Sequence, residues 1–140
     1  MCTMGAGPLA EPVRDAVLRA LEDERKAEAS YSAVLAQFGQ TRPFSNIKRA
    51  EERHSAALER LLTAHGEPIP GEKPAGAPPK YESVAAACRA GVESEKANIA
   101  LYDELYKVAL PEDVKCVFDH LRAASNDRHL PVFQSCGGSP

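Results

Sequence analysis

The sequence of 140 residues contains no apolar run near the roughly 20 residues that a helix needs to cross a bilayer. This absence argues against a membrane-spanning protein. It also lacks an excess of positive charge, because the formal net charge is −3 and the Lys and Arg residues do not cluster. Nucleic-acid-binding proteins usually carry a strong basic field. We therefore predict neither a membrane nor a nucleic acid as a partner.

Export signals and common cysteine motifs are missing too. Residues 1–5 contain no basic region and no apolar region, so we predict no signal peptide and expect a cytoplasmic protein. The four cysteines are Cys2, Cys88, Cys116 and Cys136. None of them forms a C-x-x-C pair, so a zinc ribbon or a thioredoxin-like motif has no support. In a reducing compartment, free thiols are the default expectation for such cysteines.

What the sequence does contain is helical periodicity in a chain of ordinary composition, with 44% hydrophobic and 26% charged residues. Apolar residues recur every three or four positions in four segments, as on the core-facing side of a helix. These segments predict helices over residues 12–38, 43–65, 83–109 and 112–132. Short turns between the first two and between the last two predict two helical hairpins.

Residues 66–80 form the one proline-rich stretch. At about 3.3 Å per residue they reach roughly 50 Å, whereas the preceding helix is only about 36 Å long. The stretch can therefore cross the whole bundle, so that the second and third helices run parallel. We predict an all-α, ferritin-like four-helix bundle of two hairpins joined by this long crossover. Residues 12–133 would form the single domain, with flexible tails at residues 1–11 and 134–140.

The second predicted helix places a carboxylate and an imidazole on its core-facing side. Glu51 and His54 lie three residues apart, so they share one helix face. Their positions continue an apolar series that also contains Phe44, Ile47, Leu58 and Leu61. A buried charge without a partner is costly. We therefore interpret this E-x-x-H pair as metal ligands, with a metal-free buried polar network as the alternative.

An internal repeat extends this pattern to the other helices. Residues 21–25 align without a gap with residues 92–96, and the alignment pairs the core-facing Glu24 with Glu95. Seven residues further along each helix it pairs Tyr31 with Tyr102.

The second helix of each hairpin also aligns. Residues 51–54 match residues 126–129, so that His129 corresponds to His54 while Asn126 stands where a second Glu would be. Two similar hairpins predict a pseudo-twofold bundle with its polar residues at one level. Those residues are Glu24, Glu51, His54, Glu95 and His129.

On these residues the chain resembles the ferritin-like superfamily of dimetal-carboxylate proteins, which includes rubrerythrins and ferritins. It is most similar to short bacterial ferritin-like domains of unassigned function. The resemblance implies that an inward Glu on helices one and three, and an E-x-x-H on helices two and four, hold two metal ions. The ligands implied here are Glu24, Glu51, His54, Glu95 and His129.

The departure from this pattern is Asn126, because a neutral amide cannot bridge two cations as a carboxylate can. We therefore expect an uneven or mononuclear site whose better half lies near Glu51 and His54. Glu28, one turn from Glu24, is a candidate replacement ligand or an ordinary edge residue. Asp127 is a weaker substitute because it points about 100° away from Asn126.

The predicted function is that of an iron or manganese oxidoreductase acting on dioxygen or hydrogen peroxide, with Tyr31 and Tyr102 as candidate catalytic residues. Core tyrosines with a hydrogen-bonded hydroxyl are the alternative for both. With no rubredoxin-type motif, electrons would come from an external donor or from the cysteines. The alternatives are a metal-binding or carrier protein for copper or zinc, and a structural bundle with a relict site. A homodimer is compatible with this fold.

The heights of the cysteines along the helices limit their pairing. Cys88 precedes Glu95 by seven residues and Cys136 follows His129 by seven. On antiparallel helices both thiols lie at the same end, which makes them the pair able to form a disulfide or a redox couple. Cys116 lies at the other end, near the N-terminal tail. Free thiols remain the alternative, and His65 and His120 are predicted to be ordinary surface or helix-end residues.

Overall fold

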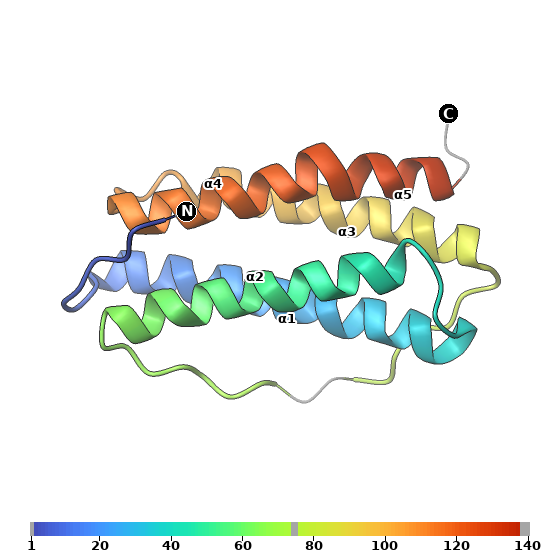
Figure 1. Ribbon diagram of the computed structural model, residues 1–140, viewed down its shortest axis with the longest axis horizontal. Helices are drawn as coiled ribbons and strands as arrows, with labels where there is room; N and C mark the ends of the chain where they lie inside the picture. Colours follow the sequence, from blue (N-terminus) through green and yellow to red (C-terminus); the bar gives the residue numbers. More distant parts are fainter. Residues whose placement is uncertain (1, 74–75, 138–140) are drawn as a thin grey trace.

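The computed structural model describes residues 2–73 and 76–137, and its secondary structure is entirely helical. Its elements are α1 (Glu11–Phe38), α2 (Phe44–Ala64), α3 (Val84–Leu105), α4 (Glu112–Ala124), the π-helical segment η1 (Ser125–His129) and α5 (Leu130–Cys136). The last three follow one another as a single long rod (Figure 1). The predicted all-α four-helix bundle is confirmed.

Local sequence sets the ends of these helices. Pro12 lies in the first turn of α1, where its missing N–H costs nothing. Gly39 ends that helix with φ of 80°, and its N–H bonds to the carbonyl of Leu35. The hydroxyl of Ser83 accepts from the N–H of Ala86 at 3.0 Å and caps the start of α3.

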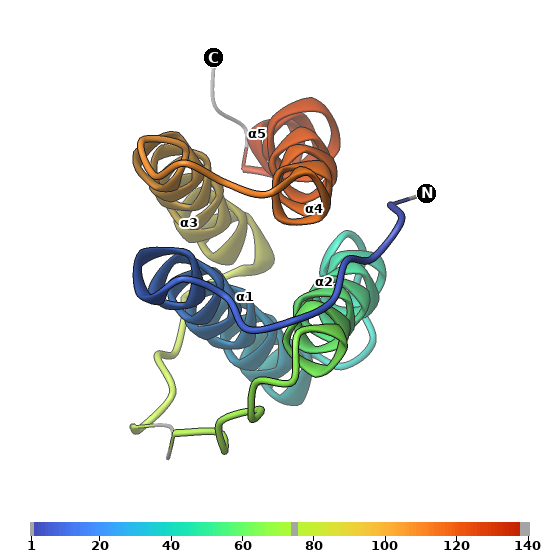
Figure 2. The ribbon, with the colours of Figure 1, turned by 90° about the vertical axis from the view of Figure 1, so that its left-hand side faces the viewer.

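The two hairpins are α1 with α2, and α3 with the α4–η1–α5 rod. The crossover runs along the outside of the bundle, and α2 and α3 point in the same direction (Figure 1). Viewed end-on, α2 and α3 occupy diagonally opposite corners (Figure 2). The crossover is fixed to α1 by Arg25, which donates to the carbonyl of Pro70 at 2.8 Å.

The core consists of two apolar clusters. One lies where α1 and α4 begin, and its largest members include Leu21, Leu58 and Phe118. The other lies at the opposite end and contains Phe44 and Phe133. Along each of the four rods, a short stretch of buried polar residues separates the positions that belong to the two clusters.

The cysteines differ from the free-thiol expectation. All four are paired, as Cys2–Cys116 at one end of the bundle and Cys88–Cys136 at the other. The second pair is the one that the sequence predicts to be able to form a disulfide, because both cysteines lie at the same end of antiparallel helices. The first forms because the N-terminal segment folds back over the start of α4, with 5.8 Å between the two Cα atoms.

Residues 2–9 are not the flexible tail that the sequence predicts. Besides the Cys2–Cys116 disulfide, the Gly5 N–H donates to Asp113 Oδ2 at 2.9 Å, and the Leu9 N–H donates to Glu67 Oε2 at 3.1 Å. At the C-terminal end, residues 134–136 are helical within α5, and residues 138–140 of the second predicted tail lie outside the described residues.

His65 lies at a helix end, directly after α2, as one of the two expectations has it, but it is not a surface residue. It is buried, with Nδ1 2.8 Å from the carbonyl of Gly7 and Nε2 2.6 Å from Asp113 Oδ2. Both ring nitrogens thus face acceptors, which favours the imidazolium form. Burial alone would lower the pKa of His65, but the hydrogen bonds to Asp113 and Gly7 raise it. Burial would raise the pKa of Asp113, and bonds from Gly5 and His65 lower it instead.

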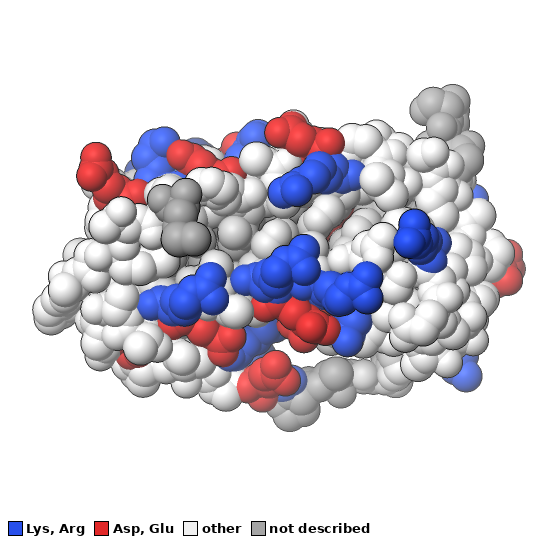
Figure 3. Space-filling model, viewed as in Figure 1, with Lys and Arg blue, Asp and Glu red and all other residues white. Residues whose placement is uncertain are grey.

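The surface carries mixed charges. On the face shown in Figure 3, Lys and Arg side chains alternate with Asp and Glu. Pairs one helical turn apart account for part of this, such as Lys48 with Glu52 at 2.7 Å. Within the described residues, no helix combines the length and apolar character that membrane crossing requires.

The His65–Asp113 pair leads to a stability prediction. Asp113→Asn should lower the free energy of unfolding by about 1–3 kcal/mol near pH 6, because it leaves a buried imidazolium without its counter-ion. The contribution of His65 is complete below its unfolded pKa and is lost as pH rises through its raised folded pKa. The contribution of Asp113 is lost as pH falls through its lowered pKa.

Denaturant unfolding of the oxidised protein at several pH values measures both effects. Asp119→Asn, an exposed carboxylate on the same helix, is the matched control and should change stability by less than about 1 kcal/mol. A loss for Asp113→Asn that stays the same above the raised pKa of His65 would contradict the assigned ion pair.

Candidate metal centre

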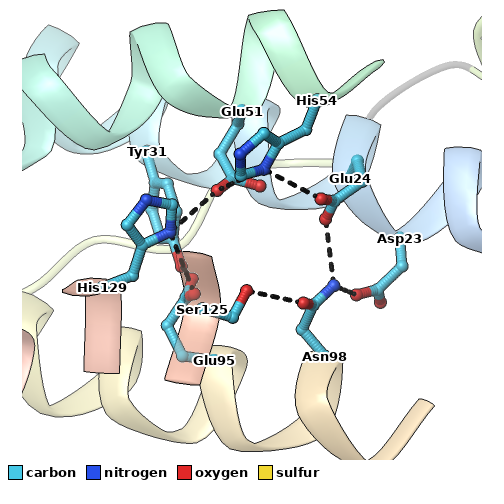
Figure 4. A network of polar contacts seen from close by, with 9 residues as sticks. All are labelled: Asp23, Glu24, Tyr31, Glu51, His54, Glu95, Asn98, Ser125 and His129. Atoms are coloured by element: carbon cyan, nitrogen blue, oxygen red, sulfur yellow. Dashed lines mark hydrogen bonds and ion pairs between the residues drawn. The ribbon is translucent and has the colours of Figure 1, made fainter. Parts of the chain in front are cut away.

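A layer of buried polar residues crosses the bundle between the two apolar clusters. α1 contributes Glu24, α2 contributes Glu51 and His54, α3 contributes Glu95, and η1 contributes His129 (Figure 4). The three carboxylates are 0–2% exposed. The structure therefore brings together the five residues that the repeat predicts to share one level.

Two groups of possible metal ligands lie within this layer. The first is Glu24, Glu51 and His54, and the second is Glu51, Glu95 and His129. In each group, one donor atom per residue lies within 4.8 Å of the others. Glu51 belongs to both groups, so its carboxylate is placed where it can bridge two cations.

The histidines contact these carboxylates through Nδ1. His54 Nδ1 lies 3.1 Å from Glu24 Oε1 and 3.6 Å from Glu51 Oε1. His129 Nδ1 lies 3.2 Å from both Glu51 Oε1 and Glu95 Oε1. The two imidazole rings are nearly parallel, with centroids 5.7 Å apart.

Glu51 is the least satisfied of the carboxylates. Its Oε1 is buried and accepts no hydrogen bond with good geometry, although His129 Nδ1 is at ion-pair distance. Burial, followed by the charge of Glu24, raises the pKa of Glu51 well above its usual value. Burial also raises the pKa of Glu24 despite its bond to His54. An unpaired buried oxygen of this kind is what a metal ion would neutralise.

The pKa of His129 is also raised, although burial by itself acts on it in the opposite direction. Burial would lower its pKa, but the neighbouring carboxylates of Glu51 and Glu95 raise it to about 9. In the metal-free protein this imidazole is therefore protonated at neutral pH. A metal ion bound at Nδ1 would take the place of that proton.

Further polar groups form hydrogen bonds to the carboxylates of this layer. The Tyr31 hydroxyl donates to Glu95 Oε2 at 2.6 Å. The Asn98 amide donates to Glu24 Oε2 at 2.9 Å, and the Ser125 hydroxyl donates to Asn98 Oδ1 at 2.7 Å. Such contacts orient ligands and tune their basicity. Ser125 carried no sequence signal.

The position of Asn126 differs from the repeat alignment. In η1 the backbone makes a π-helical turn, in which the N–H of Leu130 bonds to the carbonyl of Ser125. The buried residues of this turn are Ser125 and His129, four residues apart, and Asn126 is exposed. Pro131 follows directly and has no N–H to offer the carbonyl of Asp127, which favours the wider turn.

This shift corrects two expectations. Asn126 is not the residue that stands opposite Glu51, so it does not weaken either group, and Asp127 is also exposed. Each group contains two carboxylates and one imidazole, so the donor sets are matched in number rather than uneven. No fourth carboxylate enters the layer from η1, whose Ser125 hydroxyl bonds to Asn98.

Two further candidates lie apart from the ligand groups. Glu28 is half-buried and lines a hollow of about 830 Å³ between α1 and the crossover. Burial and the charges of Glu52 and Glu72 raise its pKa. Neither group includes it. Tyr102 is fully buried, and its hydroxyl has no partner. Burial and the nearby charges of Glu24 and Glu51 raise the pKa of Tyr102.

The unsatisfied Glu51 leads to a prediction for the metal-free protein. Glu51→Gln should raise its free energy of unfolding by about 1–3 kcal/mol near pH 7, because a neutral amide is easier to bury than a carboxyl with a raised pKa. Stability associated with such a carboxyl is lost as pH rises above its unfolded pKa. The advantage of the variant should therefore grow as pH rises from the usual pKa of a glutamate toward the raised pKa of Glu51.

Thermal or denaturant unfolding after treatment with a chelator measures this difference. Glu52→Gln, one residue along α2 and exposed, is the control and should leave stability nearly unchanged. A destabilised Glu51→Gln variant would show that the carboxylate has a structural partner in the metal-free state.

Comparison with known proteins finds no protein-family model that matches the chain and no matching curated protein. Among solved structures, the chain is similar to the crystal structure of a hypothetical protein from Methanococcus jannaschii, with a TM-score of 0.83. The two are 21% identical, and the alignment covers 98% of this chain and 87% of the other. At this level of identity the likeness shows a shared fold.

Proposed function

We propose that this chain is a ferritin-like dimetal protein, an oxidoreductase that holds two iron or two manganese ions and acts on dioxygen or hydrogen peroxide. The observation that carries the proposal is the shared position of Glu51 between two ligand groups. A layer built around one bridging carboxylate suits two neighbouring cations better than one.

The donor chemistry fits such ions. Carboxylate oxygens and imidazole nitrogens suit iron, manganese and zinc, and the absence of sulfur from both groups disfavours Cu(I). Glu24, Glu51 and His54 would hold one ion, and Glu51, Glu95 and His129 the other. Three carboxylates balance three of the four positive charges that two divalent ions bring. The remaining charge is small enough for a bound anion or hydroxide to neutralise.

Bound iron or manganese would supply electrons and open coordination positions for a small oxidant. The protein's own residues would prepare the site. Tyr31 holds a proton at its hydroxyl and presents it to Glu95. Asn98 fixes the second oxygen of Glu24. His54 has the most exposed side chain of the five ligands, at 12%, so small molecules would approach from its side.

A metal-binding or carrier protein without turnover, including one for copper or zinc, is the second candidate. The observation that favours it is that η1 contributes one imidazole and no carboxylate to the two groups, while its buried Ser125 donates to Asn98. With one bridge, the two positions would be less tightly coupled and could fill independently. A structural bundle with a relict site is the third candidate, and metal analysis separates it from the other two.

The remaining sequence expectations stay predictions. They include a cytoplasmic location, a possible homodimer and the absence of nucleic-acid partners. Two disulfides are more typical of oxidising compartments than of the cytoplasm, so the redox state of the cysteines in the cell bears on the location.

Metal loading tests the shared position of Glu51. Protein reconstituted with iron or manganese should retain two ions per chain, one for each ligand group. His54→Ala and His129→Ala should each retain about one, because each removes a ligand of one group only. Glu51→Ala should lose both. Metal analysis after gel filtration gives these stoichiometries.

Glu28→Ala is the matched control, since it removes a carboxylate of α1 outside both groups. Retention of both ions by this variant is expected, and loss of one would restore Glu28 as a ligand. Wild-type protein that retains no stoichiometric metal under any of these conditions would contradict a metal-binding function.

Oxidation kinetics separate an enzyme from a carrier. Protein loaded with Fe(II) without oxygen should be oxidised by hydrogen peroxide or dioxygen with repeated turnover when a reductant is supplied. Tyr31→Phe should bind metal normally but slow turnover by about tenfold or more, because Glu95 loses its donor. Tyr102→Phe should have little effect on turnover, since its hydroxyl contacts no ligand.

Stopped-flow absorbance follows the oxidation, and a steady-state assay follows reductant consumption. Stoichiometric loading without turnover above that of free iron would favour the carrier. Equal slowing by the two tyrosine variants would contradict the role assigned to Tyr31.

A further inference from the structure

A second set of metal-binding side chains lies at the end of the bundle where α4 begins. Cys116 and His120 are four residues apart on α4 and therefore share one helix face. The N-terminal segment adds Cys2. His120 Nδ1 lies 3.6 Å from Cys2 Sγ and 3.9 Å from Cys116 Sγ. These three residues form the one candidate ligand group with sulfur within the described part of the chain.

Contacts other than the disulfide keep Cys2 at this place. The Gly5 N–H donates to Asp113 on α4, and His65, the residue after α2, donates to the carbonyl of Gly7. Only residues 3 and 4 separate Cys2 from the first of these anchors. After reduction, Cys2 would therefore remain within about 10 Å of Gly5. Such a short tether keeps the thiol at a high effective concentration near Cys116.

The other disulfide differs in its surroundings. Cys88 is fully buried in the apolar cluster around Phe133. Within the residues that the structure describes, no histidine or carboxylate joins it and Cys136 in a ligand group. By contrast, Cys2 and Cys116 are half-buried and His120 is exposed, so both a reductant and an ion have access.

We propose that Cys2, Cys116 and His120 form a Zn²⁺ site when the Cys2–Cys116 disulfide is reduced, and that the disulfide is the closed state of this site. Two thiolates and one imidazole are a donor set that zinc prefers, with water in the fourth position. The disulfide sulfurs are not available as thiolate ligands. Reduction and zinc binding are thus coupled, and this coupling is independent of the carboxylate centre.

The chemistry balances with an external reductant. A phosphine takes up oxygen from water and passes two electrons and two protons to the disulfide, which gives two thiols. Zinc binding then displaces both thiol protons, because thiolates are the ligands. His120 Nδ1 now donates to the backbone carbonyl of Cys116 at 2.8 Å. When zinc binds at His120 Nδ1, this nitrogen would lose its proton. The neutral ring would then carry its proton on Nε2.

Cobalt titration tests the proposal, because Co²⁺ substitutes for zinc and absorbs in the near ultraviolet when thiolates bind it. Phosphine-reduced protein should show this absorption with one equivalent of cobalt, and zinc should abolish it by displacement. Oxidised protein should show none. Cys2→Ser should lose the band, and His120→Ala should weaken cobalt binding by about tenfold or more.

Matched variants separate this site from the other candidates. Cys88→Ser with Cys136→Ser should keep the band, and so should Glu51→Ala, whose expected loss of iron concerns the central site alone. His120→Ala changes an exposed residue, so a loss of affinity with an unchanged unfolding temperature cannot arise from misfolding. Absence of the band in reduced wild type, or its persistence in Cys2→Ser, would overturn the proposal.

Discussion

The main physical constraint on this structure is that three carboxylates are buried in one layer across a helical core. Glu24, Glu51 and Glu95 are almost completely hidden from solvent, and such charges are costly unless they are paired. Two histidines supply part of the compensation, since His54 contacts Glu24 while His129 contacts Glu51 and Glu95. The compensation is incomplete, because one oxygen of Glu51 accepts no hydrogen bond. The fold therefore tolerates a layer of buried carboxylates that the two histidines compensate only in part.

The apolar clusters on either side make this tolerance possible. Each of the four rods contributes apolar residues to both clusters, with α4 and α5 as the two parts of the fourth rod, so apolar packing continues on both sides of the polar layer. Both ends are also closed, by the disulfides and by the His65–Asp113 pair. The crossover lets α2 and α3 run parallel (Figure 1), which places the ligands of the two hairpins at equal heights. The stability of the fold thus comes mainly from the two apolar clusters and the closed ends. The polar layer between them contributes little to it.

The sequence predicts the fold and most of the central layer because both follow from periodicity. Glu24, Glu51, His54, Glu95 and His129 all occupy positions where a helix buries apolar residues, and they do lie together. The π-helical turn could not be predicted in this way, since a fixed step of three or four residues assumes an unbroken α-helix. It moves Asn126 outward and Ser125 inward. The folding back of residues 2–9 depends on contacts between distant segments, which helical periodicity does not encode.

The two candidate sites differ in how oxidation would affect them. The central ligands are carboxylates and imidazoles, whose donor atoms are unchanged by mild oxidants. The ligands at the end of the bundle include two cysteine sulfurs, which bind an ion as thiolates and lose that ability as a disulfide. An oxidant that meets the loaded protein would thus leave the central donor set intact while it releases an ion from the end. The hydrogen bonds of Gly5 to Asp113 and of Gly7 to His65 do not involve the cysteines, so they would keep Cys2 near Cys116 in both states. Loss of that ion therefore need not unfold the bundle, because the two apolar clusters and the second disulfide do not depend on it.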